Sequence, residues 1–458
     1  MIIDVGDKVK IIIVGIGKLG EYLAKSLVKD NNEVTLVDLD FTTSRDVIDN
    51  EDVNYICGNG LDSNVLLEAG IEDSDLLISV MDKDEQNVMS CLLGKKLGAK
   101  HTIARIRTPE YTNSINILKE ELGLSMVINP ESMTAEKIAR ALSIPSALEE
   151  TTFFQGKIQM ISLKVKEKSV LEGMTITSLS KKVSGVIVCT IERDNVVSIP
   201  NGKTKLHAGD KINITGAPKD INKFLEYTKL ISEKTKKVII CGGSDTAMYL
   251  AKNLIDMGMS VKIIELDEER CKFLSEKLPK ALIINGDVSD QNVLYEEGIE
   301  KCDAFVTLTS IDEENIVFSM FASMLNVPKI ITKVNHICLD GVVERANIDT
   351  VITPHKIATN QIVKYVRAME RGQKSPCEAI HKFDDDSFEM IEFNIKKDFK
   401  GINTCIKDMG LKDGVLIVAI LRGKNIIFPN GMDEIKFRDT IVIIDDTNSI
   451  KEINDILG

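Results

Sequence analysis

The sequence predicts an α/β protein in which a parallel-sheet domain and a smaller, β-rich α+β domain occur twice in tandem. Short, nearly continuous apolar runs alternate with segments of helical spacing, which is typical of parallel sheets covered by helices on both faces. The order of motifs that begins at residue 10 returns from residue 237 onward. Such a return indicates a duplicated two-domain unit.

The first parallel sheet begins with the most informative stretch of the chain, residues 10–40. An apolar run leads into Gly15-Ile16-Gly17-Lys18-Leu19-Gly20, a helical pattern follows, and a second apolar run ends at Asp38. In a strand–turn–helix–strand unit of this kind, the glycines allow a tight turn and let the backbone approach a pyrophosphate closely. The pyrophosphate then lies at the N-terminus of the helix. Asp38 can accept hydrogen bonds from ribose hydroxyls. The stretch therefore predicts a Rossmann-like nucleotide site.

The alternation of strands and helices continues to residue 142. We expect further strands near 54–57, 76–80, 102–106 and 126–128, and helices near 44–50, 61–69, 85–97, 109–122 and 130–142. In helix 85–97 we expect Val88, Cys91 and Leu92 to face inward. Ligands of such sheets bind at the carboxyl ends of the strands. The candidate nucleotide-binding residues are therefore Gly15, Ile16, Gly17, Lys18, Leu19, Gly20, Asp38, Asn59, Met81, Asp82 and Arg105.

A change of pattern near Phe153 marks the small domain. Short alternating segments are broken by turn sequences such as Pro200-Asn201-Gly202, which is typical of a small α+β domain. It has no glycine-rich loop and no grouped acid, histidine or nucleophile of its own. We place the four domains at 8–145, 152–230, 235–370 and 384–458, and interpret 228–236 and 371–386 as linkers.

The second copy keeps the order of motifs but changes the chemistry of its loop. Gly242 lies 227 positions after Gly15 (242 − 15 = 227), and Glu265 lies equally far from Asp38 (265 − 38 = 227). The loop itself reads Gly242-Gly243-Ser244-Asp245-Thr246-Ala247. Ser244 adds a Cβ where the backbone must approach phosphate, and Asp245 brings a negative charge to the position of Lys18.

The second set of candidate binding residues follows from the same alignment: Gly242, Gly243, Ser244, Glu265 and Lys333. Lys333 replaces Arg105 and so keeps the positive charge but loses the planar fork that grips a phosphate. We expect the first site to bind nucleotide well. For the second site three alternatives stay open: it binds weakly, binds another nucleotide, or is structural only.

Composition excludes other classes of function. A net charge of −13 argues against a nucleic-acid partner, because phosphate neutralisation needs clustered Lys and Arg. The longest uncharged stretch, 315–328, is shorter than a bilayer span, and the N-terminus lacks the pattern of a signal segment. The nine cysteines include no CxxC pair and are typical of buried residues in a reducing compartment. We expect a cytosolic protein without a metal site.

The tandem layout resembles the TrkA family, the peripheral cytosolic subunits of Trk potassium uptake systems, which are built from tandem regulator-of-potassium-conductance domains. The resemblance covers the whole chain and rests on paired motifs: IIIVGIGKLG and VIICGGSDTA, VDLD and IELD, CGNGLD and NGDVSD, and an IARIR strand. It implies a protein that is not an enzyme. NAD, NADH, ATP or ADP would bind in the Rossmann clefts, and the subunits would form a homotetrameric gating ring on the inner face of the cell membrane.

The same resemblance implies a partner and roles for individual residues. The partner is a membrane-embedded, TrkH-like subunit that translocates potassium. The family's loop contacts fall on residues 15–19, its ribose acid on Asp38, its strand-end contacts on Met81 and Asp82, and its phosphate-side or adenine-side arginine on Arg105.

Two rival functions remain open from sequence: an NAD-dependent oxidoreductase and a nucleotide-binding scaffold without a membrane partner. An oxidoreductase needs a positioned proton donor beside its substrate. The five histidines are scattered along the chain: His101, His207, His336, His355 and His381. Duplication of the nucleotide module with loss of loop glycines in one copy favours sensing over hydride transfer.

The sequence also predicts the interactions of Arg105 and Glu131 and the contacts of two apolar helices. Arg105 lies within an apolar strand, where its charge needs a partner, and we expect a ligand rather than an internal carboxylate. We explain Glu131, in the first turn of a helix, by the helix dipole. Residues 88–97 and 315–325 are apolar on more than one side of their helices, which predicts contacts between subunits of a ring.

Overall fold

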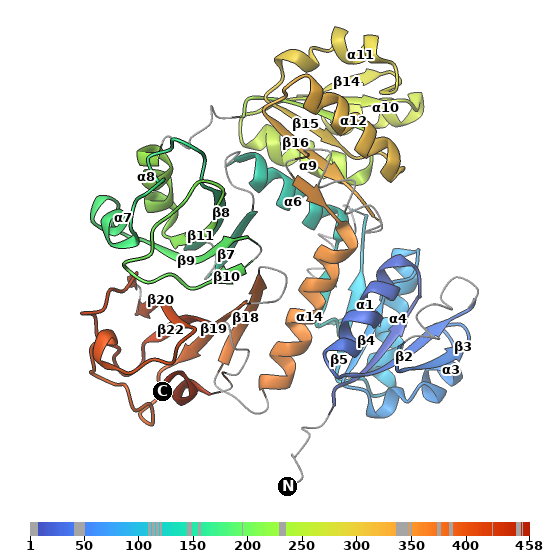
Figure 1. The fold of residues 1–458 in the computed structure, drawn as a ribbon. Helices are drawn as coiled ribbons and strands as arrows, with labels where there is room; N and C mark the ends of the chain where they lie inside the picture. The colour runs from blue at the N-terminus through green and yellow to red at the C-terminus, as the bar shows by residue number, and fades with distance from the viewer. Residues whose placement is uncertain are drawn as a thin grey trace. The chain divides into compact units, whose positions relative to one another are not determined.

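The computed structural model describes residues 8–458 apart from 41–50, 109–110, 112–114, 116–118, 120, 144–148, 154–156, 195, 229–234, 336–347, 349, 373–376, 384–387, 424, 446–449 and 451. The chain forms two compact units (Figure 1). Unit 1 comprises Met1–Ala139 and Lys236–Val366, and unit 2 comprises Arg140–Thr235 and Arg367–Gly458. Both copies of the parallel-sheet domain therefore belong to unit 1, and both small domains to unit 2.

The first Rossmann domain of unit 1 contains a parallel sheet of strand order β3-β2-β1-β4-β5-β6. Its strands are β1 (Lys10–Val14), β2 (Glu33–Asp38), β3 (Val53–Cys57), β4 (Leu76–Ser79), β5 (His101–Arg105) and β6 (Met126–Ile128). Its helices are α1 (Lys18–Lys29), α3 (Ser63–Glu68), η1 (Ile71–Asp73), α4 (Asp84–Leu97) and α6 (Pro130–Ser143). The order reverses at β1, so the switch point lies between β1 and β4.

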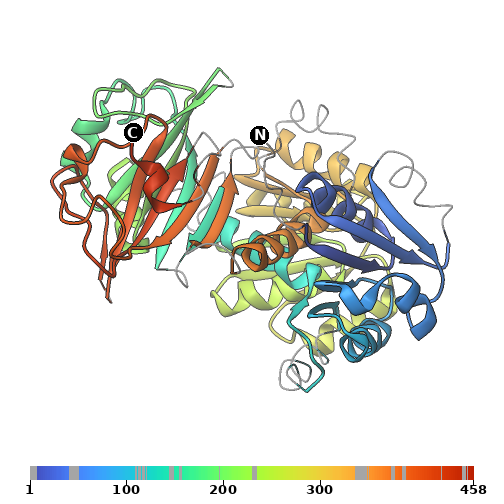
Figure 2. The same cartoon turned by 90° about the horizontal axis from the view of Figure 1, so that it is seen from below.

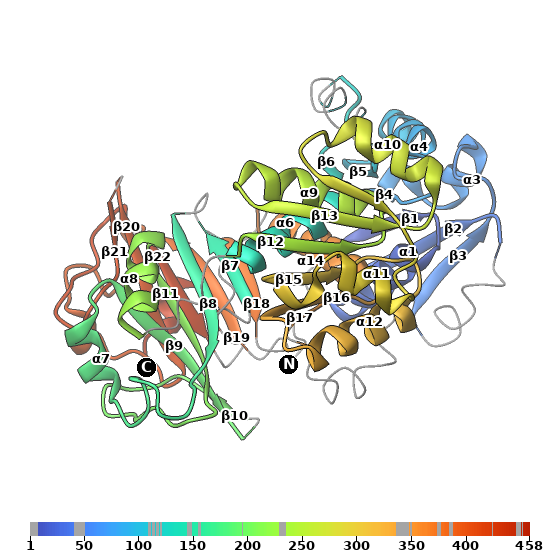
Figure 3. The same cartoon turned by 90° about the horizontal axis from the view of Figure 1, so that it is seen from above.

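The second Rossmann domain repeats this order as β14-β13-β12-β15-β16-β17. Figure 3 labels β12, β13, β15, β16 and β17 of this sheet. Its strands are β12 (Lys237–Cys241), β13 (Ser260–Glu265), β14 (Leu282–Asn285), β15 (Ala304–Thr307), β16 (Lys329–Lys333) and β17 (Thr350–Ile352). Its helices are α9 (Asp245–Asp256), α10 (Glu268–Lys277), α11 (Gln291–Glu296), η2 (Ile299–Lys301), α12 (Asp312–Met324) and α14 (Pro354–Gly372).

The small domains of unit 2 are antiparallel sheets of order β10-β9-β11-β8-β7 and β18-β19-β22-β20-β21. The first contains β7 (Glu149–Phe153), β8 (Ile158–Lys164), α7 (Ile176–Lys182), β9 (Val186–Arg193), β10 (Val196–Ser198), β11 (Lys211–Gly216) and α8 (Pro218–Thr228). The second contains β18 (Cys377–Phe383), β19 (Phe388–Asn394), η4 (Ile406–Asp408), β20 (Val415–Arg422), β21 (Asn425–Ile427), β22 (Thr440–Asp445) and η5 (Ile453–Ile456).

The two small domains share one hydrophobic core. Side chains from the two sheets form a single buried cluster, to which β8 contributes Ile158 and Met160 and β19 contributes Phe388 and Met390. The green and the orange-red strands of these two sheets lie side by side in Figure 2. The opposite face of each sheet covers a separate core of its own. The structure thus confirms the predicted fold class, two parallel-sheet domains each followed by a small β-rich domain.

The structure corrects the predicted linker at residues 371–386. Helix α14 extends to Gly372, and residues 377–383 form β18, which pairs antiparallel with β19. The register shifts between Cys377 and Ala379. Because this irregularity interrupts the two-residue period on which strand prediction depends, the sequence pattern hid the strand.

The buried face of α4 also differs from the prediction. Cys91 is buried and Val88 packs against the same core cluster, as expected, but Leu92 is only half-buried. The rest of the buried face consists of Asp84, Asn87, Ser90 and Gly94. A Cβ at position 94 would overlap the side chain of Leu77 on β4. Small and polar residues therefore let the helix approach the sheet closely. The predicted helix 44–50 lies outside the described residues, as does much of helix 109–122.

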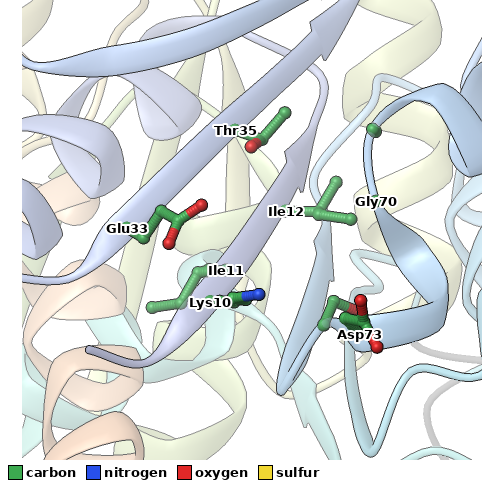
Figure 4. A pocket seen from close by; sticks show the side chains of 9 residues that line it. Lys10, Ile11, Ile12, Glu33, Thr35, Gly70 and Asp73 are labelled. Carbon is green, nitrogen blue, oxygen red and sulfur yellow. The ribbon is translucent and has the colours of Figure 1, made fainter. Parts of the chain in front are cut away.

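A small pocket lies at the amino ends of β1 and β2, lined by Lys10, Glu33, Thr35 and Asp73 (Figure 4). Ligands of a parallel sheet bind at the opposite, carboxyl edge. We therefore do not assign this pocket to the candidate nucleotide site. Every helix in the described part of the chain is too short or too polar to cross a bilayer.

Candidate functional site

The glycine loop of the first Rossmann domain has the geometry that phosphate binding requires. Gly15 has φ +95°, and a Cβ there would lie 2.8 Å from the backbone nitrogen of Met81. A Cβ at position 20 would overlap the carbonyl oxygen of Gly15. At Gly17, by contrast, a Cβ would have no described atom within 4 Å. The outer glycines are therefore needed for packing, whereas none of the described residues packs against the middle glycine at the N-terminus of α1.

Asp38 lies beside this loop, at the carboxyl end of β2. Its Oδ2 accepts a hydrogen bond from the backbone N–H of Ile16 at 2.5 Å, and its Oδ1 accepts one from the N–H of Asp40 at 3.1 Å. An ionised carboxylate has about four acceptor positions. Asp38 can therefore hold the loop and still accept a hydrogen bond from a sugar hydroxyl.

The remaining strand-end candidates lie along the same edge of the first sheet. Asn59 follows β3 and is exposed, and its Oδ1 accepts a hydrogen bond from the N–H of Leu61 at 3.0 Å. A Cβ at Gly60 would overlap Val14, so this turn packs against the strand that leads into the glycine loop. Met81 and Asp82 follow β4, on which the loop packs through Gly15.

Asn87 fixes these strand ends, and the sequence analysis missed it. Its Oδ1 accepts hydrogen bonds from the N–H of Met81 at 2.7 Å and the hydroxyl of Ser79 at 2.9 Å. Its Nδ2 donates to the carbonyl oxygens of Met81 and Arg105, each at 3.0 Å. Its amide hydrogen-bonding capacity is therefore used, and the ends of β4 and β5 are tied together.

The second Rossmann domain repeats this arrangement with Asn315. Its Oδ1 accepts a hydrogen bond from the N–H of Thr309 at 2.9 Å, and its Nδ2 donates to the carbonyl oxygen of Lys333 at 3.1 Å. Asn87 and Asn315 are 228 positions apart (315 − 87 = 228), near the period of the duplicated motifs. That shared position is the signal by which the sequence could have identified both residues.

Arg105 has an internal carboxylate partner, contrary to our preference for a ligand. Its Nη2 lies 3.1 Å from Oε1 of Glu131 on α6, and both side chains are largely buried. Glu131 lies in the first turn of α6, as expected, and its ion pair with Arg105 is a second interaction that the helix dipole does not account for. Nε of Arg105 and Oε2 of Glu131 are buried without a hydrogen-bond partner among the described residues. The pair thus retains hydrogen-bonding capacity for a further group.

Lys333 of the second Rossmann domain is electrostatically coupled to the same carboxylate. Burial lowers the pKa of Lys333, and the negative charges of Asp312 and Glu131 oppose that shift. Glu131 therefore interacts with the strand-end cations of both Rossmann domains.

A second connection between the Rossmann domains runs through Tyr249 on α9. Its hydroxyl donates a hydrogen bond to the carbonyl oxygen of Arg107 at 3.0 Å and accepts one from Nδ2 of Asn129 at 3.1 Å. The guanidinium of Arg107 in turn donates to the carbonyl oxygen of Asp82. A helix that begins at the second glycine loop thus supports the strand-end segments of the first site.

We predict that Tyr249→Phe loosens the segment 105–108. The backbone N–H groups of Arg107 and Thr108 donate to the Asp84 carboxylate at 2.8 to 3.1 Å, and Tyr249 holds the adjoining carbonyl oxygen. Loss of the hydroxyl should accelerate hydrogen–deuterium exchange in this segment and lower the free energy of unfolding by about 1 kcal/mol. Tyr295→Phe, at a half-exposed ring, is the control. Equal exchange in both variants would contradict the connection.

The second glycine loop carries the same acid contact as the first. Gly242 has φ +91°, and Oε2 of Glu265 accepts a hydrogen bond from the N–H of Gly243 at 2.5 Å. Ser244 forms the N-cap of α9, and Lys333 ends β16. The predicted residues of the second set therefore also lie at the carboxyl edge of their own sheet. Among the residues that the structure describes, no group of three or more His, Cys, Asp or Glu could hold a metal ion.

Comparison with known protein families identifies both domain types. The TrkA-N domain family matches residues 11–130 and 238–354, and the TrkA-C domain family matches residues 160–229 and 390–458. The TrkA-N match spans the parallel sheet of each copy apart from the first residue of its first strand, whereas the TrkA-C match begins after β7 in the first copy and after β18 in the second.

Full-length relatives and solved structures agree with these matches. The Trk system potassium uptake protein TrkA homolog of Archaeoglobus fulgidus is 32% identical over 98% of this chain and 99% of its own length. The Trk system potassium uptake protein TrkA of Haemophilus influenzae is 30% identical over 97% of both chains. The crystal structure of the GsuK RCK domain shares the fold, with a TM-score of 0.64 at 16% identity, covering 97% of this chain and 94% of that one.

The GsuK channel bound to NAD is similar in fold, with a TM-score of 0.65 at 17% identity over 97% of this chain and 78% of that chain. The matches to both domain types in tandem, and the identity to relatives over nearly the whole length, agree with the resemblance seen in the sequence. The chain belongs to the TrkA family.

Proposed function

We propose that this chain is a nucleotide-binding regulatory subunit that controls a membrane potassium transporter from the cytosolic side. The Archaeoglobus fulgidus and Haemophilus influenzae relatives are named as potassium uptake proteins, which supports the choice of transported ion. The observation that carries the nucleotide site is the first glycine loop, where a Cβ at Gly17 would meet no described atom within 4 Å and the Asp38 carboxylate accepts a hydrogen bond from the N–H of Ile16. These are groups that bind and orient a ligand, which favours regulation over catalysis.

The ligand we propose for the first Rossmann domain is NAD or NADH, or alternatively ATP or ADP. All four contain an adenosine ribose and a pyrophosphate linkage. The pyrophosphate would lie against the α1 N-terminus at Gly17, and the ribose hydroxyls against Asp38. GsuK, which shares the fold, is described as bound to NAD in one structure and to ADP in another. A 2′-phosphate would meet the negative charge of Asp38, so NAD should bind more tightly than NADP.

We predict that Asp38→Ala weakens nucleotide binding in the first domain by roughly 2–4 kcal/mol, because charge-assisted hydrogen bonds to the ribose are lost. Isothermal titration calorimetry with NAD and with ADP measures this loss. Glu33→Ala is the matched control, since Glu33 is an exposed acid at the opposite, amino end of the same strand. Unchanged affinity of the Asp38 variant would place the nucleotide site elsewhere.

We further propose that the chain assembles into a homotetrameric ring in which the two Rossmann domains alternate. The outer face of α12 exposes Val317, Met320 and Met324, with 60%, 41% and 79% of their surface accessible. Met89 on α4, the counterpart of Val317, is 55% exposed. Apolar side chains gathered on a helix face favour contact with another protein surface.

Val317→Glu combined with Met320→Glu should break this assembly, because two carboxylates would be buried in an apolar contact. Multi-angle light scattering at micromolar concentration should show a tetramer for the unmodified chain and smaller species for the variant. Glu314→Gln, exposed on the same helix, is the control. A monomeric unmodified chain, or a variant that remains tetrameric, would refute the proposed ring.

The switch is proposed to lie in the Arg105–Glu131 pair. A γ-phosphate at the loop adds negative charge near Lys18 and can attract Arg105, whose buried Nε has no described partner. Movement of Arg105 toward the ligand would weaken its ion pair with Glu131. The Glu131 carboxylate would then interact mainly with Lys333 of the second Rossmann domain. ATP and ADP would then stabilise different arrangements of the two Rossmann domains, as a ligand switch requires.

We predict that Arg105→Ala or Lys18→Ala reduces the difference between ATP and ADP in their control of potassium flux. The assay reconstitutes the chain with its membrane partner in liposomes and measures flux with each nucleotide. Thermal melting and light scattering should show that fold and assembly persist. Lys100→Ala, an exposed residue just before β5 that pairs with Asp75, is the control. If Arg105→Ala preserves the ratio of fluxes, Arg105 does not take part in the switch.

A further inference from the structure

The N-terminus of α9 is capped by a side chain of its own loop. Oγ of Ser244 accepts a hydrogen bond from the N–H of Ala247 at 3.4 Å. The corresponding N-cap residue of α1 is Gly17, which has no side chain to do so. The backbone N–H groups of the first turn are the donors that bind phosphate. In the second Rossmann domain, one of these donors is already used.

Arg270 on α10 lies across the same loop. Its Nε donates a hydrogen bond to the carbonyl oxygen of Gly243 at 2.6 Å, and its Nη2 lies 2.7 Å from Oδ1 of Asp245. Its guanidinium also lies 5.0 Å from the ring centre of Phe273 on the same helix. Asp245 occupies the position of Lys18 in the first loop, so the negative charge that would repel a phosphate is instead paired within the chain.

The backbone of the second loop is covered as well. A Cβ at Gly243 would lie 2.6 Å from Cδ1 of Leu274 and 2.9 Å from Oε2 of Glu265. Leu274 is buried, so the middle of α10 packs directly on the loop. The corresponding residue of the first loop is Ile16, whose side chain is also buried, so both loops are packed at this position.

Position 247 shows that the two loops cannot pack in the same way. A Cβ at Gly20 would overlap the carbonyl oxygen of Gly15, so α1 approaches its loop as closely as a glycine allows. Ala247 stands at the same place in the second domain and is fully buried. Its methyl group keeps α9 from the close approach that α1 makes.

We infer that the second glycine loop is closed by the chain's own Ser244, Asp245, Ala247 and Arg270, so that each chain binds one nucleotide, in the first Rossmann domain. This inference rests on the proposed nucleotide binding by the first domain. It resolves the alternatives for the second site in favour of a structural role. The guanidinium of Arg270 takes the place of a ligand by joining the loop carbonyl to the acid of the helix.

The test is the stoichiometry of ADP, the moiety that NAD and ATP share, measured by isothermal titration calorimetry. The unmodified chain should bind one ADP per chain, and Asp38→Ala should show no saturable site at concentrations that fill the unmodified protein. Two ADP per chain, or one site that persists in Asp38→Ala with unchanged affinity, would overturn the closure. No binding by the unmodified chain would instead refute the proposed function of the first domain.

A second set of variants tests the residues that close the second loop, in a background that removes binding by the first domain. In the Asp38→Ala background, Ser244→Gly, Asp245→Lys, Ala247→Gly and Arg270→Ala together should restore one ADP site per chain. Lys272→Ala, on the same helix but paired with Glu268 and Glu269 at the surface, should restore none. Thermal melting checks that each variant is folded. A folded four-residue variant that fails to gain binding by at least tenfold would show that these residues do not close the site.

Discussion

The hydrogen bond from a glycine-loop N–H to the acid at the end of the second strand is the constraint on which both Rossmann domains depend. It joins Ile16 to Asp38 and Gly243 to Glu265, in each case at 2.5 Å. The bond fixes the loop relative to the strand that would carry the ribose. Because an ionised carboxylate has about four acceptor positions, the same acid can hold the loop and also accept a hydrogen bond from a bound ribose.

Both copies keep this hydrogen bond, but the side chains that contact the glycine loop differ between them. The supporting contacts are kept, since Asn87 and Asn315 tie the strand ends in the same way, and Asp84 and Asp312 each accept hydrogen bonds from the segment after the fifth strand. A retained scaffold with a closed loop is suited to a supporting role. Tyr249, on the helix that follows the closed loop, reaches the first domain at Arg107. We interpret the second domain as the support against which the first can move.

The sequence predicted what depends on local pattern and on the duplication. The parallel sheets, the glycine turn at Gly15 and the position of Asp38 beside it follow from residues close together in the chain, and they are confirmed. The repeat period correctly placed the elements of the second copy.

What the sequence did not reveal depends on contacts between distant residues. Arg105 ends strand β5, and its partner Glu131 is 26 positions away on helix α6. Arg270 contacts Asp245 from 25 positions further along the chain. The buried face of α4 is polar, so a hydrophobic stripe could not identify it. An irregular register concealed β18 for a similar reason, because pattern analysis assumes an unbroken period.

The most direct measurement of the central claim is an experimental structure of the whole chain with saturating NADH. The account predicts ligand density at the first glycine loop, with the adenosine ribose on Asp38 and the pyrophosphate at Gly17. At the second loop it predicts that Arg270 remains on Gly243 and Asp245 without ligand density. Nucleotide bound at the second loop with Arg270 displaced, or bound away from Asp38, would contradict it.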